Sequence, residues 1–105
     1  MVGVPLAAGE NEFGLQGFRE LAEGGYIDIL QPDASRAGGI TECYRVGMLA
    51  AERSLPVATH TWSDAVALVA NMHLVAALPT ALTVEIDSTG NGLVDNLLAE
   101  PLQVV

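Results

Sequence analysis

Four residues that could carry out acid–base or metal chemistry each follow a short apolar run of the sequence. They are Glu10, Asp33, His60 and Glu85, and they recur roughly every 25 residues, the length of one strand, one helix and two short loops. In a series of parallel βα units, the C-terminal ends of the strands meet at one edge, where such folds carry their reactive groups. The spacing therefore predicts an enzyme, or part of one, with the four side chains in a single site.

Each of the four residues also has an ordinary alternative role. Glu10 could be a solvated loop acid or the N-terminal cap of the helix that follows it, and Asp33 could cap a turn. His60 could be a hydrogen-bonded histidine at a strand end, and Glu85 could be a surface acid. Taken singly these alternatives stay open, and it is the recurrence of polar groups after successive apolar runs that favours a shared site.

The apolar runs and the helix signals predict four strand–helix units. Continuous apolar or β-branched runs predict strands at residues 4–9, 26–31, 56–60 and 81–86. Helical spacing predicts helices at residues 12–23, from 38 onward and at 64–77, with one or two further turns within 94–100. We therefore expect an α/β fold in which each polar group lies where a strand ends.

The predicted helices differ in how much polar face they have. The first places Phe13, Gly17 and Leu21 on one stripe. The second is expected to bury one face made of Ile40, Cys43, Tyr44, Gly47, Met48 and Ala51. The third, with Ser63 as its N-cap, is apolar nearly all round, which is typical of a helix buried on more than one side. We expect it to face another subunit or a further part of a larger protein, with His73 as a hydrogen-bonded core or interface histidine.

The composition limits the partners and the location of the protein. The 105 residues suffice for one domain, half of them are hydrophobic, and thirteen acidic residues against four arginines give a net charge of -9. Such a surface disfavours nucleic acid, which needs clustered cations, but it can attract divalent cations. The single cysteine, Cys43, excludes an internal disulfide and predicts a small buried side chain. Because no basic N-terminal region or membrane-length apolar run is present, we expect a soluble cytoplasmic protein.

Four stretches of the sequence carry a resemblance to a known family. They are GENEFG at 9–14, DILQPDASRAGGITE at 28–42, PVATHTW at 56–62 and TVEIDSTGNGLVDNLLAEP at 83–101. In this order and spacing they resemble the mandelate racemase/muconate lactonizing enzyme branch of the enolase superfamily. In that family these segments are the fifth to eighth strands of a modified TIM (β/α)7β barrel. The resemblance implies four parallel βα units forming half of such a barrel, with residues 1–105 as a single domain.

The resemblance also implies a role for each candidate residue. Glu10 matches the last of three carboxylate ligands of an active-site Mg²⁺, a cation that takes oxygen ligands and polarises a bound substrate carboxylate. Asp33 and His60 match a pair in which the carboxylate fixes the imidazole tautomer and the imidazole exchanges a proton next to the substrate carboxylate. Glu85 matches an acid that hydrogen-bonds the enediolate oxygen as charge develops. A histidine base acting with bound Mg²⁺ is a general pattern of the enolase superfamily.

Other parts of the family site have no counterpart in this sequence. The family's Lys-x-Lys pair, two further carboxylate ligands and most of the capping domain correspond to positions upstream of residue 1, and the chain contains no lysine. One hypothesis is that the chain is the C-terminal half of an Mg²⁺-dependent enzyme that removes the α-proton of a hydroxy acid or acid sugar, giving racemisation or dehydration. The other is a catalytically inert half-barrel that binds Mg²⁺ weakly and acts as a self-associating structural module, because exposed strand edges favour a homo-oligomer.

Overall fold

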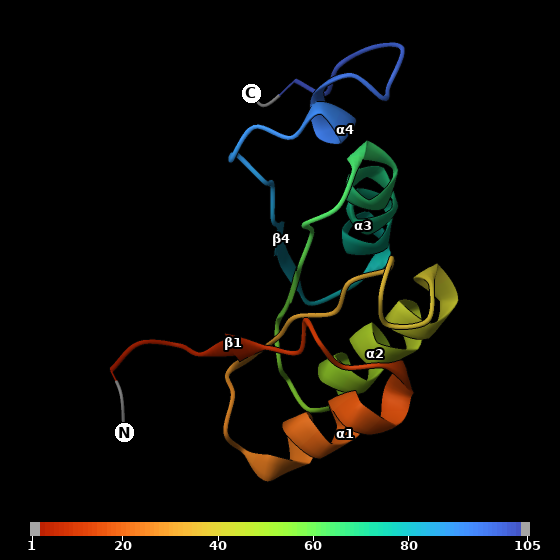
Figure 1. The fold of residues 1–105 in the computed structure, drawn as a ribbon. Coiled ribbons are helices and arrows are strands. Elements are labelled where there is room, and N and C mark those ends of the chain that lie inside the picture. The colour runs from red at the N-terminus through yellow and green to blue at the C-terminus, as the bar shows by residue number, and fades with distance from the viewer. Residues whose placement is uncertain (1–2, 104–105) are drawn as a thin grey trace.

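The computed structural model describes residues 3–103, in which four strands alternate with four helices (Figure 1). In chain order the elements are β1 (Ala7–Ala8), α1 (Gly14–Gly24), β2 (Ile29–Leu30), α2 (Ile40–Glu52), β3 (Val57–Thr59), α3 (Ala65–Ala77), β4 (Ala81–Val84) and α4 (Gly92–Asp95). The predicted α/β class with four βα units is confirmed.

The four strands form one parallel sheet in the order β1-β2-β3-β4. The register pairs Ala7 with Ile29, Leu30 with Val57, and Val57 with Ala81. Because all the strands run in the same direction, their C-terminal ends lie along one edge of the sheet. Helices α1, α2 and α3 lie together beside the sheet (Figure 1), with α1 packed on α2 and α2 packed on α3.

The strands are shorter than the predicted apolar runs because ladder pairing is limited to their central residues. At β1, the carbonyl of Leu6 accepts from the N–H groups of Asp28 and Ile29 at 2.8 and 3.0 Å, and the carbonyl of Ala8 accepts from Gln31 at 2.9 Å. The apolar residues before Leu6 lie outside this ladder and are exposed. An apolar run therefore marks where a strand passes, but hydrogen bonding to the neighbouring strand sets its length.

The core lies between the sheet and the three long helices. Its largest members come from both layers: Phe18 from α1, Leu30 from β2, Val46 from α2, Val57 from β3 and Leu74 from α3, each of them at most 1% exposed. Burial of these side chains is the main source of stability, because each one removes a large apolar surface from water. This core holds the strand ends in place.

Cys43 is fully buried in this core, as predicted. Burial raises the pKa of its thiol to about 12, and the negative charges of Asp33 and Glu42 act in the same direction. The thiol is therefore protonated and unreactive at neutral pH.

Helix α2 buries only part of the face that was predicted. Ile40, Tyr44 and Met48 are 49%, 42% and 39% exposed. Cys43 and Gly47 are buried as predicted, and Val46, Leu49 and Ala50 are buried beside them. The reason is close packing, since a Cβ atom at Gly47 would overlap the side chain of Leu78. The small residues of α2 let the helix approach its neighbours closely, and this outweighs the burial of its larger apolar side chains.

The predicted stripe of α1 is also wrong in part. Phe13 precedes the helix in an extended conformation and is 76% exposed, so it does not share the helical face. The fully buried aromatic residue of this segment is Phe18, while Leu21 packs against the edge of the core. The helix starts two residues later than predicted, which removes Phe13 from the helical spacing.

Helix α3 is capped by Asp64 and not by Ser63. The Oδ1 atom of Asp64 accepts a hydrogen bond from the N–H of Ala67 at 2.9 Å, and the Ser63 hydroxyl donates to Asp64 Oδ2 at 3.1 Å. His73, expected in a core or an interface, lies on the exposed side of the helix. That side also carries Val66, which is 61% exposed. The prediction that a partner covers it stays a prediction.

The segment after β4 forms a single helical turn, α4, and no helix follows at 96–100. Asn91 caps this turn by accepting from the N–H of Leu93 at 3.0 Å. Its side-chain amide also donates to the carbonyl of Ser63 at 2.7 Å. This bond ties the loop after β4 to the start of α3.

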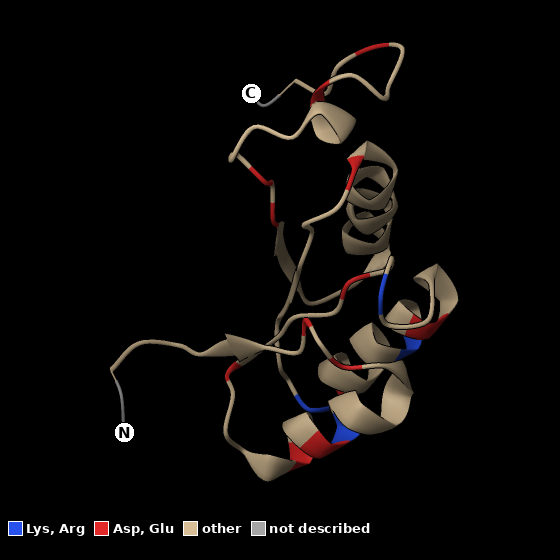
Figure 2. Cartoon of the chain, in the orientation of Figure 1, with Lys and Arg blue, Asp and Glu red and all other residues tan. Residues whose placement is uncertain are grey.

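Charge is distributed unevenly along the chain (Figure 2). All four arginines precede residue 54, so residues 54–103 carry acidic side chains without lysine or arginine. The ion pairs join Arg19 to Glu23, Arg45 to Glu42, and Arg53 to Glu23 and Glu52. Arg36 has a surface position and donates to Asn11 at 3.2 Å. No helix within residues 3–103 combines the length and the apolar character that a membrane span requires.

Candidate active site

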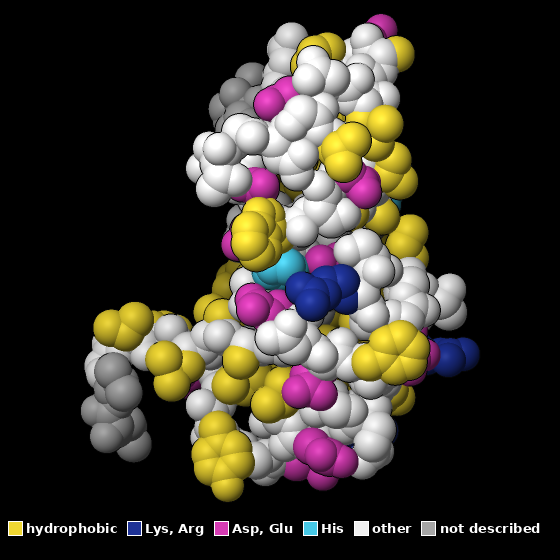
Figure 3. Space-filling view, in the orientation of Figure 1, with side chains coloured by type: hydrophobic (Ala, Val, Ile, Leu, Met, Phe, Trp, Pro, Cys, Tyr) yellow, Lys and Arg dark blue, Asp and Glu magenta, His cyan; other side chains and the backbone are white. Residues whose placement is uncertain are grey.

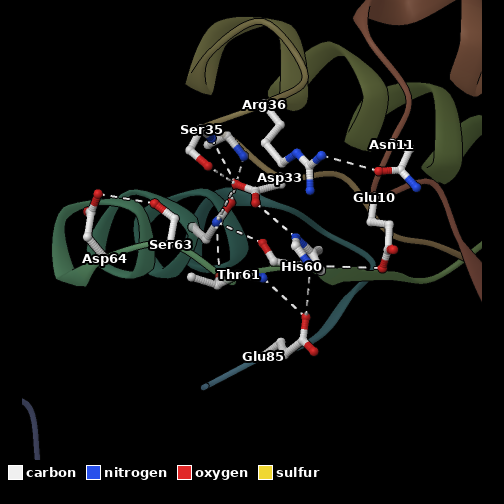
Figure 4. A network of polar contacts seen from close by, with 12 residues as sticks. Glu10, Asn11, Asp33, Ser35, Arg36, His60, Thr61, Ser63, Asp64 and Glu85 are labelled. Atoms are coloured by element: carbon white, nitrogen blue, oxygen red, sulfur yellow. Dashed lines mark hydrogen bonds and ion pairs between the residues drawn. The ribbon is translucent and has the colours of Figure 1, made fainter. Parts of the chain in front are cut away.

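The C-terminal edge of the sheet brings the four predicted residues together (Figure 4). Glu10 and Asp33 follow β1 and β2 in short loops, whereas His60 and Glu85 come directly after β3 and β4. His60 lies between the two glutamates, with its Nε2 atom 3.9 Å from Glu10 Oε2 and 4.0 Å from Glu85 Oε2. The strand ends therefore form one cluster of acids around a single imidazole.

His60 and Asp33 form a buried hydrogen-bonded pair. His60 Nδ1 lies 2.9 Å from Asp33 Oδ2, and the residues are 5% and 1% exposed. An ionised carboxylate can only accept, so neutral His60 carries its proton on Nδ1 in this arrangement. This leaves the lone pair of Nε2 directed toward Glu10 and Glu85. The Asp33–His60 pair thus has the form of an oriented general base.

Asp33 is ionised although it is buried. Burial opposes its charge, but hydrogen bonds from His60, from the backbone and hydroxyl of Ser35 and from Asn71 outweigh burial and lower the pKa of the carboxyl below its ordinary value. The local chain supports this, because Asp33 begins a turn in which the N–H of Ala37 bonds to its carbonyl at 2.8 Å. The carboxylate therefore stays negative and in register with His60 at neutral pH.

Glu85 is held at the rim by the neighbouring strand. Its N–H donates to the carbonyl of Thr59 at 3.1 Å, which continues the pairing of β3 with β4. Its Oε2 atom accepts from the N–H of Thr61 at 3.2 Å. The same oxygen is the one that faces His60. Glu85 is therefore positioned with one carboxyl oxygen next to the imidazole, while its side chain is half exposed.

Glu10 reaches the site because the chain turns sharply at Gly9. Gly9 has a φ of 130°, and a Cβ atom there would lie 2.6 Å from the ring of Phe18 and 3.3 Å from the backbone of Gln31. Only glycine fits such a position. The N–H of Glu12 closes the turn by donating to the Gly9 carbonyl at 3.0 Å. This turn directs Glu10 toward Nε2 of His60, the same atom that Glu85 approaches (Figure 4).

The cluster opens into a cavity of about 400 Å³. It is lined by Glu10, His60, Thr61, Trp62, Glu85, Ile86, Asp87, Ser88 and Thr89. In Figure 3 the imidazole (cyan) lies at the centre of this face, with acidic side chains (magenta) beside it. Trp62 is 69% exposed and lines this opening. The cavity is large enough for a small polar molecule.

A larger hollow of about 570 Å³ lies at the other end of β1, around Leu6, Tyr26 and Asp28. The Asp28 carboxylate there accepts a hydrogen bond from the N–H of Leu6 at 2.8 Å. This hollow contains no cluster of titratable groups comparable with that around His60. We therefore assign the candidate site to the smaller cavity at the C-terminal edge.

The residues at this edge do not form a complete Mg²⁺ site. Within residues 3–103 there is no group of three or more histidine, cysteine, aspartate or glutamate side chains placed to hold a metal ion. Glu10 offers a carboxylate oxygen, the type of ligand that Mg²⁺ prefers, but an octahedral Mg²⁺ needs further oxygen ligands in fixed positions. This chain could contribute one ligand and does not fit the ion by itself.

The sequence analysis missed Asn71, a fully buried residue of α3 that donates to Asp33 Oδ1 at 3.1 Å. A signal for it was present, because Asn71 is an amide in a helix that is otherwise almost entirely apolar. A buried amide needs hydrogen-bond partners. The partners that Asn71 finds are polar groups just after β2 and β3.

The profile of the family described as enolase C-terminal domain-like matches residues 1–105. The chain belongs to this family. The resemblance to the mandelate racemase/muconate lactonizing enzyme branch is thereby confirmed, and the four parallel βα units agree with the C-terminal half of an enolase-superfamily barrel. Members of the superfamily generally use Mg²⁺ and act on small carboxylates.

Solved structures agree with the family assignment. A mandelate racemase-like protein from Bordetella bronchiseptica RB50, complexed with 2-oxoglutarate/phosphate, is 41% identical to this enolase-superfamily chain, with a TM-score of 0.89. This match covers 95% of the present chain and 27% of the Bordetella protein. The 3,6-anhydro-D-galactonate cycloisomerase from Zobellia galactanivorans is 38% identical, with a TM-score of 0.85. This match covers 91% of the present chain and 27% of the cycloisomerase.

A mandelate racemase/muconate lactonizing enzyme from Jannaschia sp. CCS1 is 36% identical with a TM-score of 0.78, over 84% of this chain and 22% of that protein. The enolase-superfamily chain thus spans between 22% and 27% of the lengths of these three relatives.

Proposed function

We propose that this chain supplies the proton-transfer part of an active site that removes the α-proton of a small carboxylate, of the hydroxy-acid racemase or acid-sugar dehydratase type. The observation that carries the proposal is the Asp33–His60 pair, with Nδ1 of His60 2.9 Å from Asp33 and Nε2 facing the cavity. The name of one relative, an anhydrogalactonate cycloisomerase, supports an acid sugar as one substrate class.

In the proposed step, Nε2 of His60 takes the proton from the carbon next to the substrate carboxylate. The electron pair of that C–H bond moves into the carboxylate and gives an enediolate, while Asp33 stabilises the imidazolium that forms. General acid–base catalysis of this kind contributes roughly 10²–10⁴-fold. Racemisation then requires a proton returned to the opposite face of the carbon, and dehydration requires loss of a β-hydroxyl group as water.

Glu85 is proposed to act on the oxygen of the enediolate. Its Oε2 atom lies 4.0 Å from Nε2 of His60, so a substrate bound against the imidazole would also reach this carboxyl. In its protonated form Glu85 can donate a hydrogen bond that strengthens as negative charge develops on the substrate oxygen. The N–H of Thr61 fixes its orientation.

Glu10 is proposed as the one metal ligand that this chain contributes, with the remaining ligands supplied by residues outside it. Bound Mg²⁺ would supply electrostatic stabilisation of the substrate carboxylate. The half-exposed carboxylate of Glu10 faces the cavity, which supports this assignment. On its own the chain should bind Mg²⁺ weakly, because one carboxylate leaves most coordination positions to water.

The proposal is tested by exchange of the α-proton of 2-hydroxy acids and acid sugars in deuterated water with Mg²⁺, followed by NMR. Because this chain offers only one Mg²⁺ ligand, we expect slow exchange, and we expect its rate to fall by about 10²-fold or more in His60→Asn, which removes the base and retains a side-chain amide to donate to Asp33. His73→Gln is the matched control because His73 is exposed on α3. Equal exchange in His60→Asn and wild type would contradict the proposal.

A second candidate function is supported by the two open edges of the sheet. Strands β1 and β4 each have one neighbour within the described residues, and Leu82 on β4 is 60% exposed. We propose that a chain without the other barrel strands pairs through these edges with a second copy and then acts as a structural module. Failure of every tested acid to exchange would favour this module over the enzyme.

A further inference from the structure

Asn71 is the most constrained polar side chain outside the four candidate residues. It lies in α3, is fully buried, and is surrounded on that helix by apolar residues. We propose that Asn71 is a positioning residue that fixes the relative placement of Asp33 and His60. This inference rests on the proposed function, in which the Asp33–His60 pair is the base.

The amide of Asn71 bonds to both members of the pair. Its Nδ2 atom donates to Asp33 Oδ1 at 3.1 Å and to the main-chain carbonyl of His60 at 3.0 Å. Its Oδ1 atom accepts from the N–H of Ala34, next to Asp33, at 2.9 Å. A single side chain therefore ties the loop after β2 to the end of β3.

The contact with Asp33 controls which carboxylate oxygen faces the imidazole. Asp33 Oδ1 accepts three hydrogen bonds, from the backbone and hydroxyl of Ser35 at 2.8 Å each and from Asn71 at 3.1 Å. Oδ2 remains for Nδ1 of His60 at 2.9 Å. With Oδ1 engaged on two sides, rotation of the carboxylate would break several bonds at once, so the bond to Nδ1 keeps its direction.

Asn71 also reaches the third member of the site through Thr61. Nδ2 of Asn71 lies 3.0 Å from Thr61 Oγ1, to which it donates. The N–H of Thr61 in turn donates to Glu85 Oε2. An amide has two N–H hydrogens, so three acceptors within 3.1 Å share them. The ends of β2, β3 and β4 are thus linked through one side chain of α3.

A packing role alone does not account for an amide at this position. A leucine of similar volume would bury more apolar surface at this point of the helix, whereas a buried amide is tolerated only when its hydrogen bonds are made. Asn71 makes bonds with both its oxygen and its nitrogen, and all of them end on residues 33–34 and 60–61. Its bonding is therefore directed entirely at the site.

The test is NMR of the purified protein with ¹⁵N-labelled histidine, at a pH where the imidazoles are neutral. In wild type we expect His60 as the Nδ1–H tautomer with a Nδ1 proton protected from solvent exchange. In Asn71→Leu and in Asn71→Asp, which keeps the acceptor for Ala34 but removes the donors, we expect that protection to be lost and the tautomers to mix. Exposed His73 provides an internal reference.

Leu74→Val is the matched control, because Leu74 is buried on the same helix and belongs to the apolar core cluster. It lowers stability and should leave the His60 signals unchanged. If Asn71→Leu does not fold, Asn71→Ser, which keeps one hydroxyl donor, replaces it in the comparison. A protected Nδ1–H tautomer in the Asn71 variants equal to wild type would overturn the proposal.

The readout needs no substrate, so the inference and the proposed function can fail separately. Loss of the His60 signature in the Asn71 variants supports the positioning role whatever the exchange assay gives. Absence of α-proton exchange with the signature intact in wild type would overturn the proposed function alone.

Discussion

Asp33 combines near-complete burial with a negative charge, and this has a consequence for stability as a function of pH. Hydrogen bonds from His60, Ser35 and Asn71 outweigh the effect of burial and lower its pKa in the folded state. A carboxyl with a lowered folded pKa stabilises the fold above its unfolded pKa, near 3.9, and this contribution disappears as the pH falls through the folded value.

We therefore expect the free energy of unfolding of wild type to fall more steeply below about pH 4 than that of Asp33→Asn. The difference between the two proteins should be largest near neutral pH and shrink on acidification. Urea unfolding at a series of pH values measures it. Ser35→Ala, which removes one of the donors to Asp33, should lie between them. A difference independent of pH would contradict the assignment of a stabilised carboxylate.

At the level of residues, the four strand-end side chains could be predicted from the sequence, whereas Asn71, which hydrogen-bonds to Asp33, could not. Glu10, Asp33, His60 and Glu85 could be found because each follows an apolar run, and parallel strands bring such positions to one edge. Asn71 could not be paired with Asp33 in this way, since Asp33 lies 38 residues away in sequence and the contact depends on the packing of α3 on the sheet. The catalytic roles of all four residues stay predictions.

At the level of elements, the start of α3 gives a measurable prediction. Asp64→Ala removes the side chain that accepts from the N–H of Ala67 and leaves that donor without its cap. Loss of an N-cap of this type costs about 1 kcal/mol. The Ser63 hydroxyl bonds only to the Asp64 side chain, so Ser63→Ala should cost clearly less. Thermal or urea unfolding of both variants measures the difference, and an equal loss would contradict the assignment of Asp64 as the cap.

The order and type of the elements could be predicted from apolar runs and helical spacing, but the orientation of the helices could not. Helix α2 has two adjoining apolar stripes, and periodicity alone does not decide between them. Gly47 is shared by both stripes, and the stripe that also contains Val46 and Ala50 faces inward, with Leu78 packed where a Cβ atom at Gly47 would lie. Contacts with distant segments determine which stripe is buried. The spacing within α2 alone therefore predicted burial of Ile40, Tyr44 and Met48, which are exposed.

At the level of the whole molecule, the open sheet edges predict association. We expect sedimentation velocity to give a mass of two or more chains of 10.9 kDa. Leu82→Lys, which adds a charge to the exposed edge strand β4, should shift the protein toward single chains. Ile40→Lys is the matched control, since Ile40 is 49% exposed on helix α2 and does not belong to an edge strand. A single boundary at the mass of one chain in wild type would contradict the prediction.

The acidic lining of the cavity has a further consequence for any anion that enters it. Glu10, Glu85 and Asp87 line the cavity together with His60, and the lining residues include no lysine or arginine. A carboxylate arriving at this mouth meets repulsion from like charges at short range, where water screens poorly. If the proposed function holds, an acid substrate should dock more readily once positive charge close to His60 offsets these carboxylates. Figure 4 shows Arg36 on the side of Asp33 and Glu10, so this arginine is one source of such charge within the chain.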